Sequence, residues 1–380
     1  MIPLAVPNIS GKESVYLQEC VTSSFVSSVG PFVTRLEQMC VQAGGAAHAV
    51  AASSGTSGLH LALTAVGVKA GDLVIAPSFT FIASANAISH CGASPWLFDV
   101  SEEHWTLDAE QVGAELQQKT LRDGDRLVHK ETGRRIAAIL AVHTLGHPAD
   151  MDALGAIASR FGIPLVADAA AALGARYKGS KVGPLAKLSV FSFNGNKTVT
   201  AGGGGMVVGQ DAELLRWCRH LSTTARSGVD YEHDAVGFNY RMTNLQAAVG
   251  CAQMERLDEF VSAKQRIDAT YREALVGVAG LSSFPVASWA TSACWFSGVV
   301  LPRNAPRSVR EICKLLRERD IEARTFWKPV HQQAPYAACP RAAMNICEDI
   351  WSRILTLPCS TNLTADEQDT VIGALTEILR

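Results

Sequence analysis

The sequence predicts an α/β fold with a mostly parallel sheet, followed by a smaller α+β domain. Apolar runs of strand length alternate with segments long enough for crossover helices, which is typical of parallel sheets. With 380 residues, the chain is also too long for an ordinary single compact domain. The apolar runs are Leu73–Ala76, Pro95–Phe98, Ile136–Val142, Pro164–Ala167 and Leu188–Phe193.

Two helix starts support this organisation. Ser54–Ser57 places small polar residues before an apolar repeat at helical spacing, so we expect a helix to begin there. Thr243 and Gln246 resemble a capping box, and the apolar repeat that follows continues to about Leu275. The sequence therefore predicts a long amphipathic helix that opens the second domain.

The expected boundary divides the chain into a large domain, residues 1–243, and a small domain, residues 244–380. The small domain is expected to be α+β, because strand-formers gather around Trp295–Leu301 and helix-formers around Ser308–Arg319.

Composition excludes several classes of protein. With 48% hydrophobic and 18% charged residues, the chain is expected to be folded throughout. A formal net charge of -2 and scattered Lys and Arg leave no basic field for nucleic acid. The cysteines show no metal-ligand spacing, so we expect reduced core thiols and no metal. Without a targeting segment or a run of about 18 apolar residues, a cytoplasmic protein with no membrane partner is expected.

Lys197 stands in the most informative stretch of the chain. An apolar strand from Leu188, a short polar turn and Lys197 are followed by the glycines 202–205. Most lysines are solvated surface residues. Here the glycines would let the backbone approach a bound group closely. The stretch alone is compatible with a surface lysine and with a functional one.

Asp168 follows an apolar strand, at the edge where ligands of open α/β sheets gather. A simpler interpretation is that Asp168 caps a following alanine-rich helix. Together with Lys197 it suggests a pyridoxal cofactor, which needs a lysine for its aldehyde, an acid for its ring nitrogen and donors for its phosphate. The helix start at Ser54–Ser57 and Ser192 would supply donors, although a capped helix without a ligand has the same sequence. A phenylalanine of Pro77–Ser84 would stack on the cofactor or lie in the core.

Several motifs in order resemble the DegT/DnrJ/EryC1/StrS family of sugar aminotransferases over nearly the whole chain. The resemblance implies fold type I of pyridoxal-phosphate enzymes, whose large domain has a mostly parallel mixed sheet flanked by helices. Pro7–Lys12, Asn194–Lys197 and Phe326–His331 are most similar to the LegC-like branch, associated with 4-amino sugars. The motifs are Phe25–Gly30, Ser54–Ser57, Pro77–Ser84, Val142–Pro148, Asp168–Ala170, Ser192–Lys197 and Gly237–Arg241.

The resemblance also implies roles for individual residues. Lys197 would be the Schiff-base lysine and Asp168 the partner of the pyridine nitrogen. Phe81 would cover the ring, and Asn239 would reach the partner subunit's cofactor phosphate, which implies a homodimer with shared active sites. The remaining cofactor contacts would be Ser54, Gly55, Thr56, Ser57, Ser192 and Asn194. The substrate side would hold His143, Arg241, Lys328 and His331, although a structural role for these residues stays open.

Two positions depart from the family pattern. Ala167 stands where the family usually has Glu, and Ala171 stands where it usually has Gln or Glu near the cofactor's phenolic oxygen. The loss at Ala171 would alter the tuning of the cofactor or make room for another substrate group.

The expected function is a ping-pong transamination. Glutamate would convert pyridoxal phosphate to pyridoxamine phosphate, which would aminate the 4-keto carbon of a nucleotide-linked 6-deoxy sugar while Lys197 moves the proton. A pyridoxal-dependent sugar dehydratase is an alternative, but such relatives usually replace the lysine by histidine. A regulator that binds the cofactor without turnover is supported only by Ala167 and Ala171. The nucleotide, amination at C3 or C4, and the stereochemistry depend on loops and subunit contacts.

Overall fold

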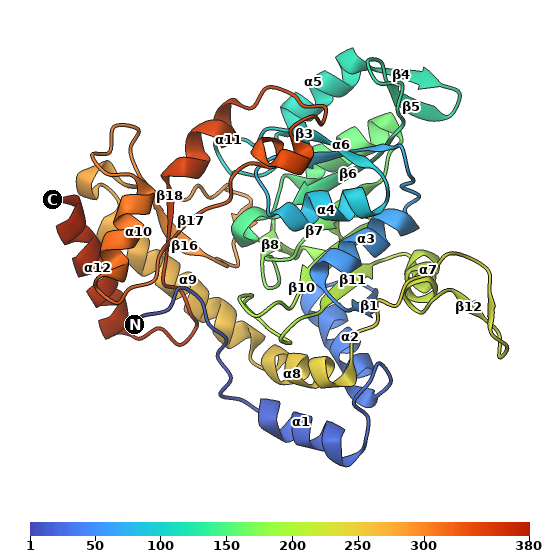
Figure 1. The fold of residues 1–380 in the computed structure, drawn as a ribbon, viewed down its shortest axis with the longest axis horizontal. Helices are drawn as coiled ribbons and strands as arrows, with labels where there is room; N and C mark the ends of the chain where they lie inside the picture. The colour runs from blue at the N-terminus through green and yellow to red at the C-terminus, as the bar shows by residue number, and fades with distance from the viewer.

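A seven-stranded sheet forms the centre of the large domain in the computed structural model, which describes all residues from Met1 to Arg380 (Figure 1). Its order is β1-β11-β10-β7-β6-β2-β3, and β11 alone runs in the direction opposite to the other six strands. The predicted mostly parallel mixed sheet is therefore confirmed. The strands are β1 His48–Ala52, β2 Leu73–Pro77, β3 Ser94–Phe98, β6 Ile136–Val142, β7 Leu165–Asp168, β10 Leu188–Ser192 and β11 Gly205–Gly209.

The five predicted strands correspond to β2, β3, β6, β7 and β10, with ends shifted by at most one residue. The sequence did not predict β1 and β11. These strands are rich in alanine and glycine, which are depleted in strands, so local propensity is weak. They form because β11 pairs with β10 on one side and with β1 on the other.

Helices cover both faces of the sheet, because its strands are apolar on both sides. Val74 and Ala76 of β2 pack in the core shared with α3, α4 and α7, whereas Leu73 and Ile75 pack in the core shared with α5 and α6. The α2 helix packs in a third core, with β1, β10 and β11. These helices are α2 Pro31–Gly44, α3 Gly55–Ala65, α4 Ile82–His90, α5 Ala109–Lys119, α6 Met151–Phe161 and α7 Ala212–Ser222.

The single long helix expected after Thr243 is wrong: two helices, α8 Asn244–Met254 and α9 Leu257–Leu275, occupy this stretch. The predicted capping box between Thr243 and Gln246 is present. The break lies at Glu255, whose carboxylate accepts a hydrogen bond from the Tyr16 hydroxyl of α1 Glu13–Thr22 at 2.6 Å. As a result α8 packs on α1 and α2, while α9 continues toward the small domain.

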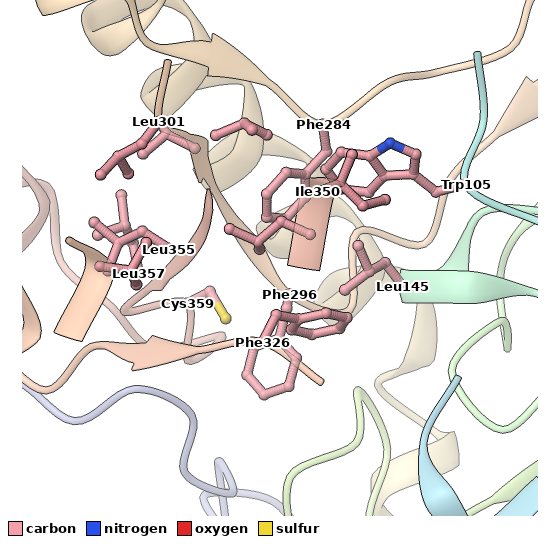
Figure 2. Close-up of a cluster of buried hydrophobic side chains, with 14 of the residues drawn as sticks. Trp105, Leu145, Phe284, Phe296, Leu301, Phe326, Ile350, Leu355, Leu357 and Cys359 are labelled. Carbon is pink, nitrogen blue, oxygen red and sulfur yellow. The ribbon is translucent and has the colours of Figure 1, made fainter. Parts of the chain in front are cut away.

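The small domain has an antiparallel sheet of order β14-β16-β18-β17, as expected for an α+β unit. The beginning of the chain lies with it, because Ile2 pairs with Ile321. Figure 2 shows its core, which also receives Trp105 and Leu145 from the large domain. The boundary between residues 243 and 244 stays a prediction. The elements are β14 Ser282–Ser283, β16 Ser297–Val300, β17 Arg324–Thr325, β18 Ile354–Leu357, α10 Val309–Arg317, α11 Asn345–Ile350 and α12 Ala365–Leu379.

Short paired strands complete the fold. The β12–β13 hairpin extends away from the large domain (Figure 1). None of the helices combines the length and the apolar character needed to cross a membrane. The remaining strands are β4 Thr120–Asp123, β5 Arg126–His129, β8 Arg176–Tyr177, β9 Ser180–Lys181, β12 Arg226–Ser227, β13 Glu232–His233 and β15 Ala290–Thr291.

Lys264 of α9 joins this helix to the small domain. Its buried ammonium group donates to the carbonyl oxygens of Trp295 at 3.0 Å and Cys359 at 2.5 Å. Lys264→Met is expected to lower the free energy of unfolding by about 3 kcal/mol, because two buried carbonyl groups lose a charged donor. Urea unfolding measures the change. Lys187→Met, at an exposed lysine, is the control and should stay within about 0.5 kcal/mol of the wild type. Equal stability of the two variants would contradict the role of Lys264.

Candidate active site

A cavity of about 470 Å³ lies between the carboxyl ends of the parallel strands and the small domain. The residues following several strands meet there, as expected for an open α/β sheet. Of the residues predicted from the sequence, the cavity is lined by Ser54, Gly55, Thr56, Phe81, His143, Asp168, Ser192, Asn194 and Lys197. Ser57, Asn239, Arg241, Lys328 and His331 do not line it.

The start of α3 forms one end of the cavity. Ser54 accepts a hydrogen bond from the Ser57 N–H at 3.0 Å, and the Ser57 hydroxyl accepts one from the Ser54 N–H at 2.9 Å. Ser57 therefore closes the turn. The amides of Gly55 and Thr56, in the first turn, have no acceptor within the helix and suit an anion. A Cβ on Gly55 would lie 2.9 Å from the Ser192 Cβ, so glycine allows the close approach.

Asp168 ends β7 and is only 6% exposed. Its carboxylate accepts hydrogen bonds from the Ser84 hydroxyl at 2.6 Å and the Ala170 N–H at 3.0 Å. Burial raises the pKa of Asp168, and these hydrogen bonds and the Lys197 charge oppose the rise. The alanines after Asp168 form turns, so the interpretation of Asp168 as a helix cap is wrong. The sequence motif included Ser84 but gave no sign of this contact.

Lys197 lies half-buried in the turn after β10. Burial lowers the pKa of Lys197 to about 8, against the opposing effect of Asp168. Its Nζ atom lies 3.5 Å from the centroid of the Trp295 ring, within the range of a cation–π interaction. At mildly alkaline pH, a large share of Lys197 is therefore the deprotonated, neutral amine. This form suits a lysine that attacks carbonyl groups.

Trp295 was missed by the sequence reasoning, although it lies directly over Lys197. Its indole N–H donates to the Asn196 carbonyl at 2.7 Å, and its backbone N–H donates to the Leu145 carbonyl at 3.1 Å. The tryptophan is thus held by two loops of the large domain. Only an apolar strand was recognisable in this part of the sequence.

Aromatic rings from both domains form the wall of the cavity facing the sheet edge. The ring centroid of Trp327 lies 5.9 Å from those of Phe81 and Trp295. Phe79 is fully buried in the core, whereas Phe81 is 54% exposed and lines the cavity. Rings placed in this way exclude water and offer flat surfaces to a ligand.

His143 follows β6, beside Asp168, and its N–H donates to the Asp168 carbonyl at 3.0 Å. The Nδ1 atom accepts a hydrogen bond from the Ala149 N–H at 3.1 Å. Burial lowers the pKa of His143 to about 3, so the ring is neutral and its proton is on Nε2. The Nε2 atom is buried and has no partner.

The remaining predicted residues lie elsewhere. His331 is buried between the Ser78 hydroxyl, 2.7 Å from Nδ1, and the Glu348 carboxylate, 2.9 Å from Nε2. Lys328, Arg241 and Asn239 are exposed. His331 therefore joins a C-terminal segment to the end of β2 and does not face the cavity of its own chain.

Comparisons with known proteins agree with this arrangement. The sequence model of the DegT/DnrJ/EryC1/StrS aminotransferase family matches residues 7–376. GDP-perosamine synthase of Caulobacter vibrioides is 37% identical over 383 residues, with 100% of this chain and 98% of the relative covered. The dTDP-3-amino-3,4,6-trideoxy-alpha-D-glucose transaminase of Streptomyces venezuelae is 36% identical over 334 residues, covering 87% and 82%. The S. venezuelae DesV structure, in complex with a ketimine intermediate, has a TM-score of 0.86 at 31% identity and covers 97% and 94%.

Asp168→Asn is expected to stabilise the ligand-free protein by about 1 kcal/mol at pH 7, because it replaces a buried ionisable carboxyl by a neutral amide. Burial holds the folded-state pKa of Asp168 above its ordinary value of 3.8. Protonation of this carboxyl therefore favours folding, and the stability it contributes is lost as the pH rises through the raised pKa. The gain of the variant should shrink on acidification.

Urea unfolding at several pH values measures this gain. Asp152→Asn is the control, because Asp152 is exposed and paired with Lys178, so its replacement should bring no gain. A destabilised Asp168→Asn protein at pH 7 would contradict the expectation.

Proposed function

Because the chain belongs to the DegT/DnrJ/EryC1/StrS aminotransferase family, we propose that it transfers an amino group from glutamate to the C4 keto carbon of a nucleotide-linked sugar, using pyridoxal phosphate. The observation that carries the proposal is the meeting of Lys197, Asp168 and the start of α3 in one cavity. The cavity volume is also within the range of small-molecule sites, about 300–1,000 Å³.

The residues present fit pyridoxal phosphate. Lys197 supplies the amine for its aldehyde, and Asp168 supplies the carboxylate for its ring nitrogen. The start of α3 and Ser192 offer donors to its phosphate, and the unpartnered Nε2–H of His143 offers a further donor inside the cavity. Phe81 and Trp295 provide rings at the cavity wall. Asn194 is proposed to contact the same group.

When bound, the cofactor supplies an aldehyde that combines with amino groups and a ring that accepts an electron pair. Asp168 would keep the ring nitrogen protonated, since its buried carboxylate would gain from a cationic partner. Lys197, with its lowered pKa, takes up a proton at Nζ and returns it. Overall, glutamate loses its amino group and two electrons and becomes a keto acid. The sugar's keto carbon gains both, so no external reductant is needed.

A nucleotide-linked sugar is proposed because two relatives carry GDP-linked and dTDP-linked sugars in their names. The exposed Arg324 at the cavity offers a cation for a diphosphate, and Trp327 beside it offers an aromatic face. Amination at C4 follows the similarity to the LegC-like branch, whereas the name of the S. venezuelae relative indicates C3. The position of the new amine in the product distinguishes amination at C4 from amination at C3.

A homodimer with shared sites is part of the proposal. Exposed apolar side chains on α1 and in the segment after it include Val15, Phe25 and Val29. They suit a subunit contact. The exposed Asn239 and Arg241 would then reach the partner's site, as would Lys328, which also lies outside the cavity of its own chain.

The first test is the visible spectrum of the protein with pyridoxal phosphate. Wild type is expected to show a band at about 410–430 nm. Glutamate should remove this band, and 4-keto sugar nucleotides should restore it with formation of an amino sugar. Lys197→Ala should show neither the band nor the response. A wild-type spectrum that glutamate leaves unchanged would overturn the proposal.

The second test asks whether the two subunits share their sites, by combining two defective variants in one heterodimer. Asn239→Ala is expected to weaken cofactor binding at the partner's site, and Lys197→Ala to inactivate its own. A heterodimer of these two variants has one site with both residues intact, so it should regain about half of the wild-type activity. A heterodimer of wild type with the double variant has no intact site and is the control. If Asn239 instead served its own chain, the order would be reversed, because only the control heterodimer would then have an intact site; that outcome would contradict shared sites.

A further inference from the structure

Two buried side-chain atoms without a partner belong to residues that line the cavity, His143 Nε2 and Thr144 Oγ1. Thr144 also lines a separate void of about 20 Å³, which can hold a water molecule. His143 lines only the main cavity and is 1% exposed. A buried donor without an acceptor is costly, so the Nε2–H of His143 indicates a ligand atom that accepts a hydrogen bond there.

The fold fixes the direction and the proton of this donor. The Ala149 N–H donates to Nδ1, which leaves the proton on Nε2. The backbone of His143 is held by its hydrogen bond to the Asp168 carbonyl. His143 is therefore a neutral donor in one orientation, ready before any ligand binds.

Strand order decides which edge of a bound ring His143 faces. In pyridoxal phosphate, the carbon bearing the aldehyde lies between the carbons bearing the ring oxygen and the phosphate arm, and the ring nitrogen lies opposite. The phosphate donors stand on the β1 and β10 side of β7, which carries Asp168, and β6 with His143 stands on the other side. The ring oxygen of the bound cofactor would therefore face β6.

Apart from the Thr144 hydroxyl, which also borders the separate void, the other residues at this edge offer no side-chain donor. Val142, Ala170 and Ala171 line the cavity with apolar side chains. We propose that the Nε2–H group of His143 donates a hydrogen bond to the ring oxygen of bound pyridoxal phosphate and thereby lowers the proton affinity of the lysine-bound cofactor. The inference rests on the function proposed above and assigns to His143 a positioning and tuning role at the cofactor.

The effect on proton affinity follows from charge. The ring oxygen is negative, and a proton on the nitrogen that joins Lys197 to the cofactor compensates its charge. Once that proton has left, the charge of the oxygen is no longer compensated, so its hydrogen bond from His143 becomes stronger. The His143 donor therefore favours the form of the cofactor in which the linking nitrogen is deprotonated. The other titratable or charged side chains lining the cavity are Asp168, Lys197 and Arg324, and His147 acts electrostatically on His143 from outside the cavity.

The test is the pH midpoint at which the visible band of the lysine-bound cofactor changes, a measurement that does not depend on turnover. His143→Phe and His143→Ala both remove the donor, and His143→Phe keeps most of the ring volume. Either folded variant should raise the midpoint by about one to two pH units, the strength of a hydrogen bond to a charged group. His147→Gln, which changes the neighbouring histidine outside the main cavity, should leave the midpoint in place.

Adding Ala171→Gln to either His143 variant supplies an amide donor at the same edge and should reverse at least half of the shift. A midpoint unchanged by loss of His143, or a shift that Ala171→Gln leaves in place, would overturn the inference. Failure of the wild type to form the visible band would instead overturn the proposed function itself.

Discussion

The candidate active-site cavity depends on the parallel pairing of β6, β7 and β10. Val142 of β6 and Val190 of β10 both lie beside Asp168 of β7, so the residues after these strands meet at one edge. Main-chain hydrogen bonds extend the register past the strands, from the His143 N–H to Asp168 and from the Ala169 N–H to Val190. A slip by one residue would turn Asp168 to the opposite face of the sheet. Apolar cores on both faces make such a slip costly, and they thereby hold the carboxylate in place.

The small domain covers this edge of the sheet and supplies tryptophan side chains that these three strands themselves lack. Trp295 and Trp327 cover the cavity, and Trp295 bonds to the loops that contain Asn196 and Leu145. The ammonium group of Lys264 donates a hydrogen bond to the backbone carbonyl of the same tryptophan. The burial that lowers the pKa of Lys197 therefore depends on how closely the two domains pack. The packing of the two domains therefore also controls the reactivity of Lys197.

The sequence predicted features that are local. The strands with bulky apolar residues, the cap at Ser54 and the turn carrying Lys197 are each encoded in a few adjacent residues. Features that depend on distant partners were not predictable: β1 and β11 form through pairing, and the break before α9 lies at Glu255, which contacts the distant Tyr16. A motif cannot show whether the two nitrogens of His331 are already bonded within the protein.

The two departures from the family pattern have different physical meanings. Ala167 is fully buried in β7, between Ala141 and Ser189, where a carboxylate would have to be desolvated inside the core. Alanine there fits the packing and removes no group from the cavity. Ala171, in contrast, contributes only a methyl group to the cavity that the unpartnered His143 donor also lines. The groups around Lys197 and Asp168 are unaffected by either alanine, so the alanines argue for a retuned site and not for a protein that has lost turnover.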